Sequence, residues 1–169
     1  NKDYIKIKKK FGFKLTSDQK TALEQINKDL KSNQKMFRLL QGDVGSGKTI
    51  VALIASANVV SSGFQVCLMA PTEILAKQHY TLANKLFDDH IKIGLLTSNT
   101  ERKERSNIIG DLANNKINIL IGTHSLFQNK INYGKLGLII IDEQHKFGVK
   151  QRKKLSDKGG KNCDVLVMS

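Results

Sequence analysis

Short apolar runs alternate with amphipathic segments along most of the 169-residue chain. The apolar runs predict strands over residues 36–40, 65–69, 91–96, 117–121, 136–141 and 165–168. Apolar residues at helical spacing predict helices over residues 16–32, 48–61, 73–87 and 101–114. This alternation is typical of an α/β fold in which a doubly wound, mostly parallel sheet carries helices on both faces.

Local signals sharpen several of these boundaries. The run Leu136–Ile141 is apolar throughout, as expected of a strand buried on both faces. Pro71 ends the preceding strand pattern and Thr72 is a suitable N-cap. The helix that follows is expected to point Leu75, Leu82 and Leu86 inward. Residues 1–14 are basic and predict a lead-in segment, so residues 15–169 form the one expected domain.

Charge, hydropathy and cysteine content add to this picture. A formal charge of +13 suggests a polyanionic partner such as nucleic acid, although a genome rich in A/T codons would also raise the lysine content. No apolar stretch is long enough to span a membrane. Cys67 and Cys163 lie far apart in apolar surroundings, which predicts reduced core thiols in a cytoplasmic protein. The polar start without Met suggests a cut-out piece of a longer chain or a processed chain.

The turn after the first strand carries the pattern G-x-x-x-x-G-K-[ST], with a strand before it and a helix after it. Its residues are Gly42, Asp43, Val44, Gly45, Ser46, Gly47, Lys48 and Thr49. Glycines let successive backbone N–H groups approach phosphate oxygens, and the following helix adds its positive end. Lys48 is expected to reach the β- and γ-phosphates of a nucleoside triphosphate, and the Thr49 hydroxyl to bind Mg²⁺.

Two carboxylates follow directly on the most apolar strand, at Asp142 and Glu143. Ligands of doubly wound sheets lie outside the carboxyl ends of the strands, so both are expected at the edge that carries the phosphate-binding turn. Asp142 is predicted to hold Mg²⁺ with Thr49, and Glu143 to orient and deprotonate the attacking water.

Taken together, GDVGSGKT (42–49), APTEILAKQH (70–79), GTHSL (122–126), DEQH (142–145) and KFGVKQR (146–152) resemble the first motor domain of RecG helicases. These are superfamily 2 DNA helicases with RecA-like motors, and the resemblance runs from about Phe13 to Ser169. Transcription-repair coupling translocases have a similar motor. The APTEILA and DEQH motifs favour RecG, because the translocases typically carry a different second-strand motif and DEEH.

The resemblance implies roles for individual residues. It implies that Phe13, Thr16 and Gln19 contact the adenine of ATP, although Thr16-x-x-Gln19 is also a helix capping box. It implies that two turns touch the DNA backbone, unless they are only structural, and their residues are Pro71, Thr72, Glu73, Gly122, Thr123 and His124. It also implies that Gln144, His145 and Arg152 couple nucleotide state to DNA grip. His79 and His90 match no ligand role and are expected on a helix surface and in a loop.

The resemblance implies a parent that unwinds branched or forked DNA in recombination and repair, using ATP and Mg²⁺. Two features depart from the family. Lys146 stands where the family usually has Arg, and a lysine cannot make a bidentate contact. The second motor domain, with its arginine finger, and the wedge domain for branched DNA are missing. We therefore expect the 169-residue piece to be nearly inactive alone. A non-hydrolysing basic DNA-binding remnant is the alternative class.

Overall fold

The computed structural model describes residues 15–32, 36–40, 47–123, 126, 131–142 and 163–168. Its helices are α1 (Ser17–Leu30), α2 (Gly47–Ser61), α3 (Glu73–Leu86) and α4 (Arg102–Ala113). Its strands are β1 (Phe37–Leu40), β2 (Gln65–Met69), β3 (Ile93–Leu96), β4 (Ile119–Gly122), β5 (Leu136–Asp142) and β6 (Asp164–Met168). Among these described residues, the helix and strand patterns of the sequence each correspond to one element.

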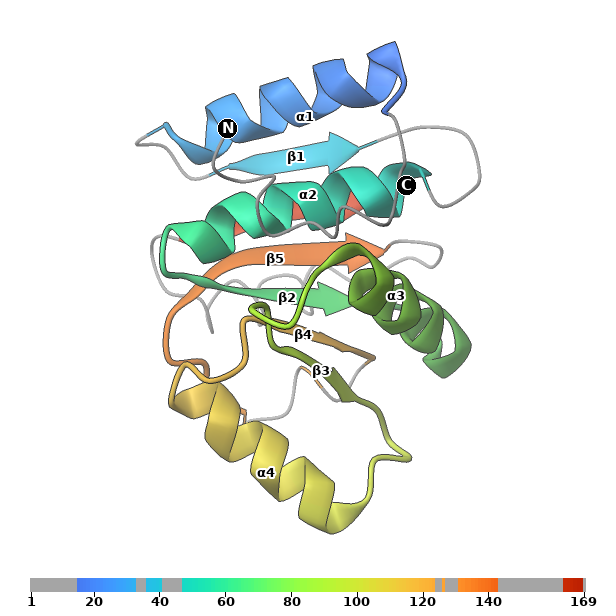
Figure 1. The fold of residues 1–169 in the computed structure, drawn as a ribbon, viewed down its shortest axis with the longest axis vertical. Coiled ribbons are helices and arrows are strands. Elements are labelled where there is room, and N and C mark those ends of the chain that lie inside the picture. The colour runs from blue at the N-terminus through green and yellow to red at the C-terminus, as the bar shows by residue number, and fades with distance from the viewer. Residues whose placement is uncertain are drawn as a thin grey trace.

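The strands pair in the order β1-β6-β5-β2-β4-β3, and every one of these pairs is parallel. Parallel neighbours require a crossover connection, which α2, α3 and α4 supply between the first four strands (Figure 1). The predicted parallel α/β sheet is therefore confirmed.

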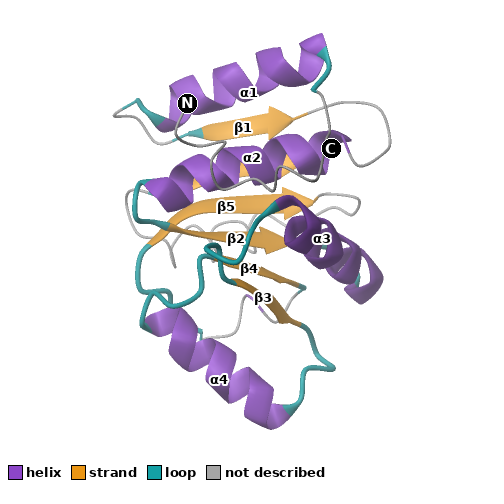
Figure 2. Ribbon diagram, viewed as in Figure 1, coloured by secondary structure: helices purple, strands orange, loops and turns teal. Residues whose placement is uncertain are grey.

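Alternating side chains of the strands pack into two separate hydrophobic cores, one on each face of the sheet. In β2, Val66 and Leu68 pack in the core that contains residues of α1, α2 and α3. The intervening Cys67 and Met69 pack in the second core, with side chains of α4. Successive residues of a strand point to opposite faces, so α4 covers the face opposite the other three helices. Figure 2 shows α4 at the β3 end of the sheet, away from α1 and α2. The prediction of helices on both faces is confirmed. None of the described helices is long and apolar enough to cross a membrane.

The register of the sheet brings the carboxyl ends of the strands level with one another. Leu40 of β1 lies beside Met168 of β6, and Met168 lies beside Asp142 of β5. Neighbouring strands are about 4.8 Å apart, so the end of β1 lies about 10 Å from Asp142. On the other side, Met69 pairs with Ile141 and with Gly122. One edge of the sheet therefore carries the starts of all the turns that the sequence marked as functional.

Three expectations about the elements were wrong in detail. Strand β4 runs from Ile119 to Gly122 instead of over residues 117–121, and Ile117 is buried just before the strand. Strand β3 begins at Ile93 instead of residue 91, because Ile91 belongs to the turn after α3, where it is nevertheless buried. In α3 the buried residues are Ala76, His79, Ala83 and Leu86, whereas Leu75 and Leu82 are only partly buried. Small alanines at the contact let the helix approach the sheet closely, which rotates the two leucines to the flanks. Leu86 points inward as expected.

The neighbouring strand β3 leaves no space for a side chain at Gly122, the last residue of β4. A Cβ on Gly122 would overlap the carbonyl oxygen of Leu96, with which it is paired, and would also press on Leu126. The close approach of β3 and β4 at this end of the sheet thus requires a residue without a side chain.

We expect Gly122→Ala to lower the free energy of unfolding by about 1–3 kcal/mol, because backbone atoms must shift to accept the methyl group. Gly110→Ala is the matched control. Gly110 lies in α4, where an added Cβ meets no other atom within 4 Å, so alanine should raise stability by up to about 1 kcal/mol. Urea unfolding followed by circular dichroism would measure both. Equal midpoints for Gly122→Ala and the unmodified chain would contradict this account of the glycine.

Neither Cys67 nor Cys163 forms a disulfide and both are fully buried, as the sequence predicted. Burial, reinforced by the neighbouring Cys163, raises the pKa of Cys67 to about 12. Since the thiolate is the reactive form, the Cys67 thiol stays neutral and unreactive at physiological pH.

We expect neither Cys67 nor Cys163 to react with Ellman's reagent at pH 8 within minutes in the folded chain, because both are covered and Cys67 stays protonated well above this pH. Two thiols should react at once after unfolding in concentrated urea. Rapid labelling of two thiols without denaturant would show that this part of the core is open.

Candidate functional site

The first turn of α2 lies at the carboxyl edge of the sheet. Strand β1 ends at Leu40 and α2 begins at Gly47, so Lys48 and Thr49 occupy the first turn of this helix. Thr49 is only 6% exposed, and Lys48 is half-buried. Residues 41–46, with Gly42, Asp43, Val44, Gly45 and Ser46, lie outside the described residues.

Helix α2 is held rigidly in this position because it is apolar on nearly every side. Most of its residues are buried, among them Val51, Leu53 and Ile54. It packs between the sheet and α1 in the larger core. All residues of α2 are described, and its first turn contains no acidic side chain. The positive end of the helix dipole is therefore not neutralised from within the helix, which favours an anion there.

Gln19 lies beside the start of α2 while it also caps α1. Its side-chain oxygen accepts a hydrogen bond from the Thr16 backbone at 2.9 Å, and its own backbone N–H donates to the Thr16 hydroxyl at 3.2 Å. The capping box is thus present. The amide Nε2 of the same side chain donates to the Gly47 carbonyl at 3.4 Å. A Cβ at Gly47 would meet this nitrogen at 2.8 Å, so a larger residue there would displace the end of the Gln19 side chain.

Asp142 ends β5 and is buried, with 7% of the residue exposed. Its Oδ2 accepts a hydrogen bond of 2.8 Å from Nε2 of His79, which is 8% exposed. The expectation that His79 lies on a helix surface was therefore wrong. His79 is on the buried face of α3 because it is three residues from Ala76 and four from Ala83, and this spacing places all three on one side of a helix. That spacing was the signal available in the sequence.

Thr49 and Asp142 offer oxygen donors that suit Mg²⁺. A hydroxyl and a carboxylate are hard ligands, and magnesium usually takes one or two such protein groups and completes its shell with phosphate oxygens and water. No three His, Cys, Asp or Glu side chains cluster within the described part of the chain. A nucleotide-dependent magnesium site fits these residues better than a metal cage built from protein alone.

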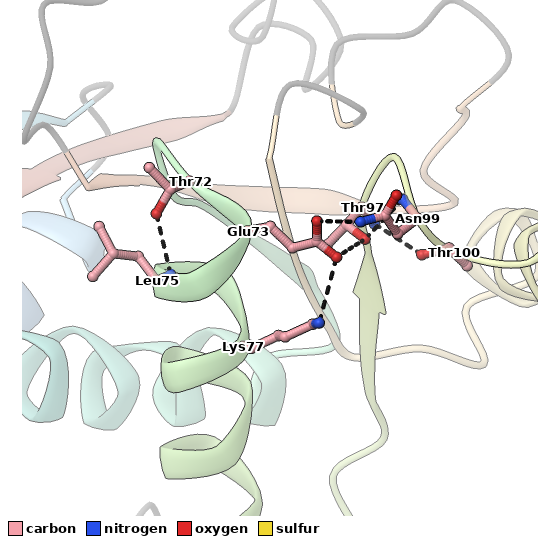
Figure 3. Close-up of polar contacts among 7 residues, drawn as sticks. All are labelled: Thr72, Glu73, Leu75, Lys77, Thr97, Asn99 and Thr100. Atoms are coloured by element: carbon pink, nitrogen blue, oxygen red, sulfur yellow. Dashed lines mark hydrogen bonds and ion pairs between the residues drawn. The ribbon is translucent and has the colours of Figure 1, made fainter.

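The turn between β2 and α3 contains Pro71, Thr72 and Glu73. Thr72 is the N-cap of α3, and its hydroxyl accepts a hydrogen bond from the Leu75 N–H at 3.2 Å (Figure 3). The capping role that the sequence left open is therefore present. Thr72 is exposed and the first turn of α3 points out of the sheet edge, so a phosphate could reach the N-terminal end of this helix.

The Glu73 carboxylate joins this turn to the one that follows β3. It accepts hydrogen bonds from the Thr97 hydroxyl at 3.2 Å and from Nδ2 of Asn99 at 2.6 Å (Figure 3). Lys77 lies 3.5 Å from the same carboxylate, one helical turn along α3. Thr97 is itself bonded through its backbone to the Thr100 hydroxyl at 2.9 Å. No role was predicted for residues 97–100, which this network places beside the predicted DNA-contacting turn.

The turn after β4 is adjacent to the turn after β2. The Ala70 N–H donates to the Gly122 carbonyl at 2.8 Å, which holds the two strand ends together. Thr123 follows and is half-buried. The two turns that were predicted to contact DNA are therefore neighbours on the same edge of the sheet.

The remaining predicted site residues lie outside the described part of the chain. They are Phe13, His124, Glu143, Gln144, His145 and Arg152. His90 is exposed in the turn after α3, so its prediction as a loop histidine is confirmed.

Comparison with known proteins agrees with the fold and the motifs. Residues 16–169 match the DEAD/DEAH box helicase family. The ATP-dependent DNA helicase RecG of Streptococcus pneumoniae serotype 4 is 47% identical over 163 residues, which cover 96% of this chain and 24% of the relative. The chain thus spans about a quarter of the length of the curated relatives it matches.

Solved structures give the same answer. The structure of RecG bound to a three-way DNA junction superposes with a TM-score of 0.81 at 43% identity, covering 99% of this chain and 22% of the other. Mss116p bound to ssRNA and AMP-PNP has a TM-score of 0.77 at 20% identity, with 100% of this chain and 38% of the other covered, and supports the fold alone. The predicted RecA-like fold and the resemblance to RecG are confirmed, and the chain belongs to the DEAD/DEAH box helicase family.

Proposed function

We propose that the chain is the ATP-binding motor domain of a cytoplasmic DNA helicase that unwinds branched or forked DNA in recombination and repair. The motor spans residues 15–169 and residues 1–14 lead into it. One observation carries the proposal: the first turn of α2, with Lys48 and Thr49, and the buried carboxylate of Asp142 share one edge of the sheet. The RecG relatives support this parent over a transcription-repair translocase.

The chain's own residues divide the nucleotide chemistry among them. The N–H groups of residues 42–47 and the Lys48 ammonium bind the phosphates of ATP, and its adenine is contacted by Phe13 and Gln19. Thr49 and Asp142 hold Mg²⁺, which neutralises charge that develops on the phosphate oxygens. Glu143 orients the attacking water and accepts its proton. The state of the nucleotide is coupled to DNA binding by Gln144, His145 and Arg152.

DNA runs along the same edge, over the turns that follow β2 and β4. Pro71, Thr72, Gly122, Thr123 and His124 contact its phosphate backbone, which fixes register without reading sequence. Glu73 has a different role in this surface, because its carboxylate already accepts hydrogen bonds from Thr97 and Asn99 in the turn after β3. It shapes the surface instead of offering its charge to a phosphate. A formal charge of +13 favours the polyanion over long range.

Hydrolysis needs a second motor domain across the nucleotide. In two-domain motors of this kind, ATP lies between the domains and its hydrolysis opens and closes the cleft. The 169-residue chain supplies one wall of that cleft. It should therefore bind nucleotide weakly and turn it over slowly.

Lys48→Ala tests the nucleotide assignment. Hydrogen bonds to charged groups contribute about 1.5–3 kcal/mol, so the Kd for a fluorescent ATP analogue with Mg²⁺ should rise by about 10- to 150-fold. For a weak binder this rise removes detectable binding in a fluorescence titration.

Lys85→Ala is the matched control, since it removes the same charge from an exposed position in the last turn of α3. It should leave the Kd unchanged. If Lys48→Ala bound the analogue as tightly as Lys85→Ala, the phosphate-binding assignment would be wrong.

A steady-state ATPase assay with and without forked DNA tests the requirement for a second domain. We expect the 169-residue chain to hydrolyse ATP about 10³–10⁵-fold more slowly than a longer chain that includes the second motor domain, because an arginine finger contributes a factor of this size. The longer chain should be stimulated by forked DNA. Robust DNA-stimulated turnover by the short chain would sink this account.

A further inference from the structure

The His79–Asp142 hydrogen bond joins the strand that ends at the nucleotide site to the helix that begins at the DNA-facing turn. The two residues are 63 positions apart in the chain. Only about a tenth of each side chain is exposed, so the bond is shielded from solvent. None of the roles assigned above uses His79.

We propose that His79 is a positioning residue for the carboxylate that holds Mg²⁺, and that it links this carboxylate to the position of α3. The inference rests on the proposed function, since it gives a further residue to the same nucleotide site. His79 acts through Asp142 and does not itself touch nucleotide or metal.

The first argument concerns the carboxylate. Asp142 is a buried side chain at the end of a strand, and a rotation about its side-chain bonds would redirect both oxygens. The Nε2–H of His79 engages Oδ2 at 2.8 Å and so fixes the plane of the carboxylate. Carboxylates that bind metals are commonly held by such outer hydrogen bonds, and loss of the partner typically lowers metal affinity about 10- to 100-fold.

The second argument concerns α3. Its cap, Thr72, and its first residue, Glu73, form the turn proposed to meet DNA, and Glu73 also holds the turn after β3. His79 follows Glu73 by six residues, which is about 9 Å along a rigid helix. A small shift of α3 on contact with DNA must therefore move the Nε2 that orients Asp142. The bond gives a direct mechanical path between the two sites.

The test compares His79→Ala, His79→Leu and His79→Gln with Gln78→Ala, an exposed neighbour on α3. The leucine keeps the packing volume without a donor, and the glutamine amide can still donate to Asp142. For each variant, the Kd of a fluorescent ADP analogue is measured with and without Mg²⁺. Mn²⁺ binding in the presence of ADP is followed by electron paramagnetic resonance, and urea unfolding checks the fold.

We expect the alanine and leucine variants to bind the analogue without metal within twofold of the unmodified chain. The enhancement by Mg²⁺, and the affinity for Mn²⁺, should fall about tenfold or more. His79→Gln should recover most of the loss, and Gln78→Ala should behave as the unmodified chain. A residue with only a structural role would alter the unfolding midpoint and leave the enhancement unchanged.

If either the alanine or the leucine variant folds and Mg²⁺ still raises its nucleotide affinity as much as in the unmodified chain, the positioning role is wrong. The proposed function would still stand. If the unmodified chain bound no nucleotide at all, the proposed function and this inference would fall together.

The link through α3 is tested by adding forked DNA. DNA should change the Kd of the Mg²⁺-bound analogue in the unmodified chain and change it less in His79→Ala. An equal change in both, or none in either, would remove the link.

Discussion

The parallel hydrogen-bonded register of the sheet is the constraint on which both proposed sites depend. Because every described strand pair is parallel, every strand delivers its last residue to the same edge. The period of two in a strand then fixes the face as well as the edge. Ile140 packs in the core with α1, α2 and α3, and Ile141 packs with α4, so Asp142 returns to the face of α2 and α3. A slip of one residue in β5 would turn this carboxylate away from His79.

The strand order places the proposed nucleotide site and the proposed DNA-facing turns on neighbouring strands of one edge. Strand β5 lies between β6, which adjoins β1, and β2, which leads into α3. Asp142 is thus within two strands of the turn before α2 and lies next to β2, which ends at Met69 just before the turn that contains Pro71. Helix α2 is anchored by burial on nearly all sides, whereas α3 keeps an exposed outer face with Ile74 at 71% exposure. The better buried helix carries the residues proposed to bind phosphate, and the more peripheral one carries the turn proposed to face DNA.

The existence of each element could be predicted because periodicity and turn residues report on burial locally. The inward face of α3 could not be predicted as well, because large leucines suggested one phase of the helix while close packing through Ala76 and Ala83 selected another. The phosphate-binding turn and the metal-binding role of Asp142 were predicted from motifs whose residues are close in sequence, and both stay predictions. His79 was missed because its partner is 63 residues away, and no local pattern shows that a helix and a strand end will meet.

Glu73 shows how an acidic side chain can belong to a surface that is proposed to bind a polyanion. An acid in the first turn of a helix is stabilised by the helix dipole, and a Glu–Lys pair spaced by four residues adds a few tenths of a kcal/mol. Lys77 is 62% exposed, so this ion pair contributes little to stability. The two hydrogen bonds from Thr97 and Asn99 are more directional than the ion pair, and they join two separate turns. The carboxylate therefore matters chiefly for shape. Because it ties the turn after β3 to the cap of α3, any movement of that cap carries residues 97–99 with it.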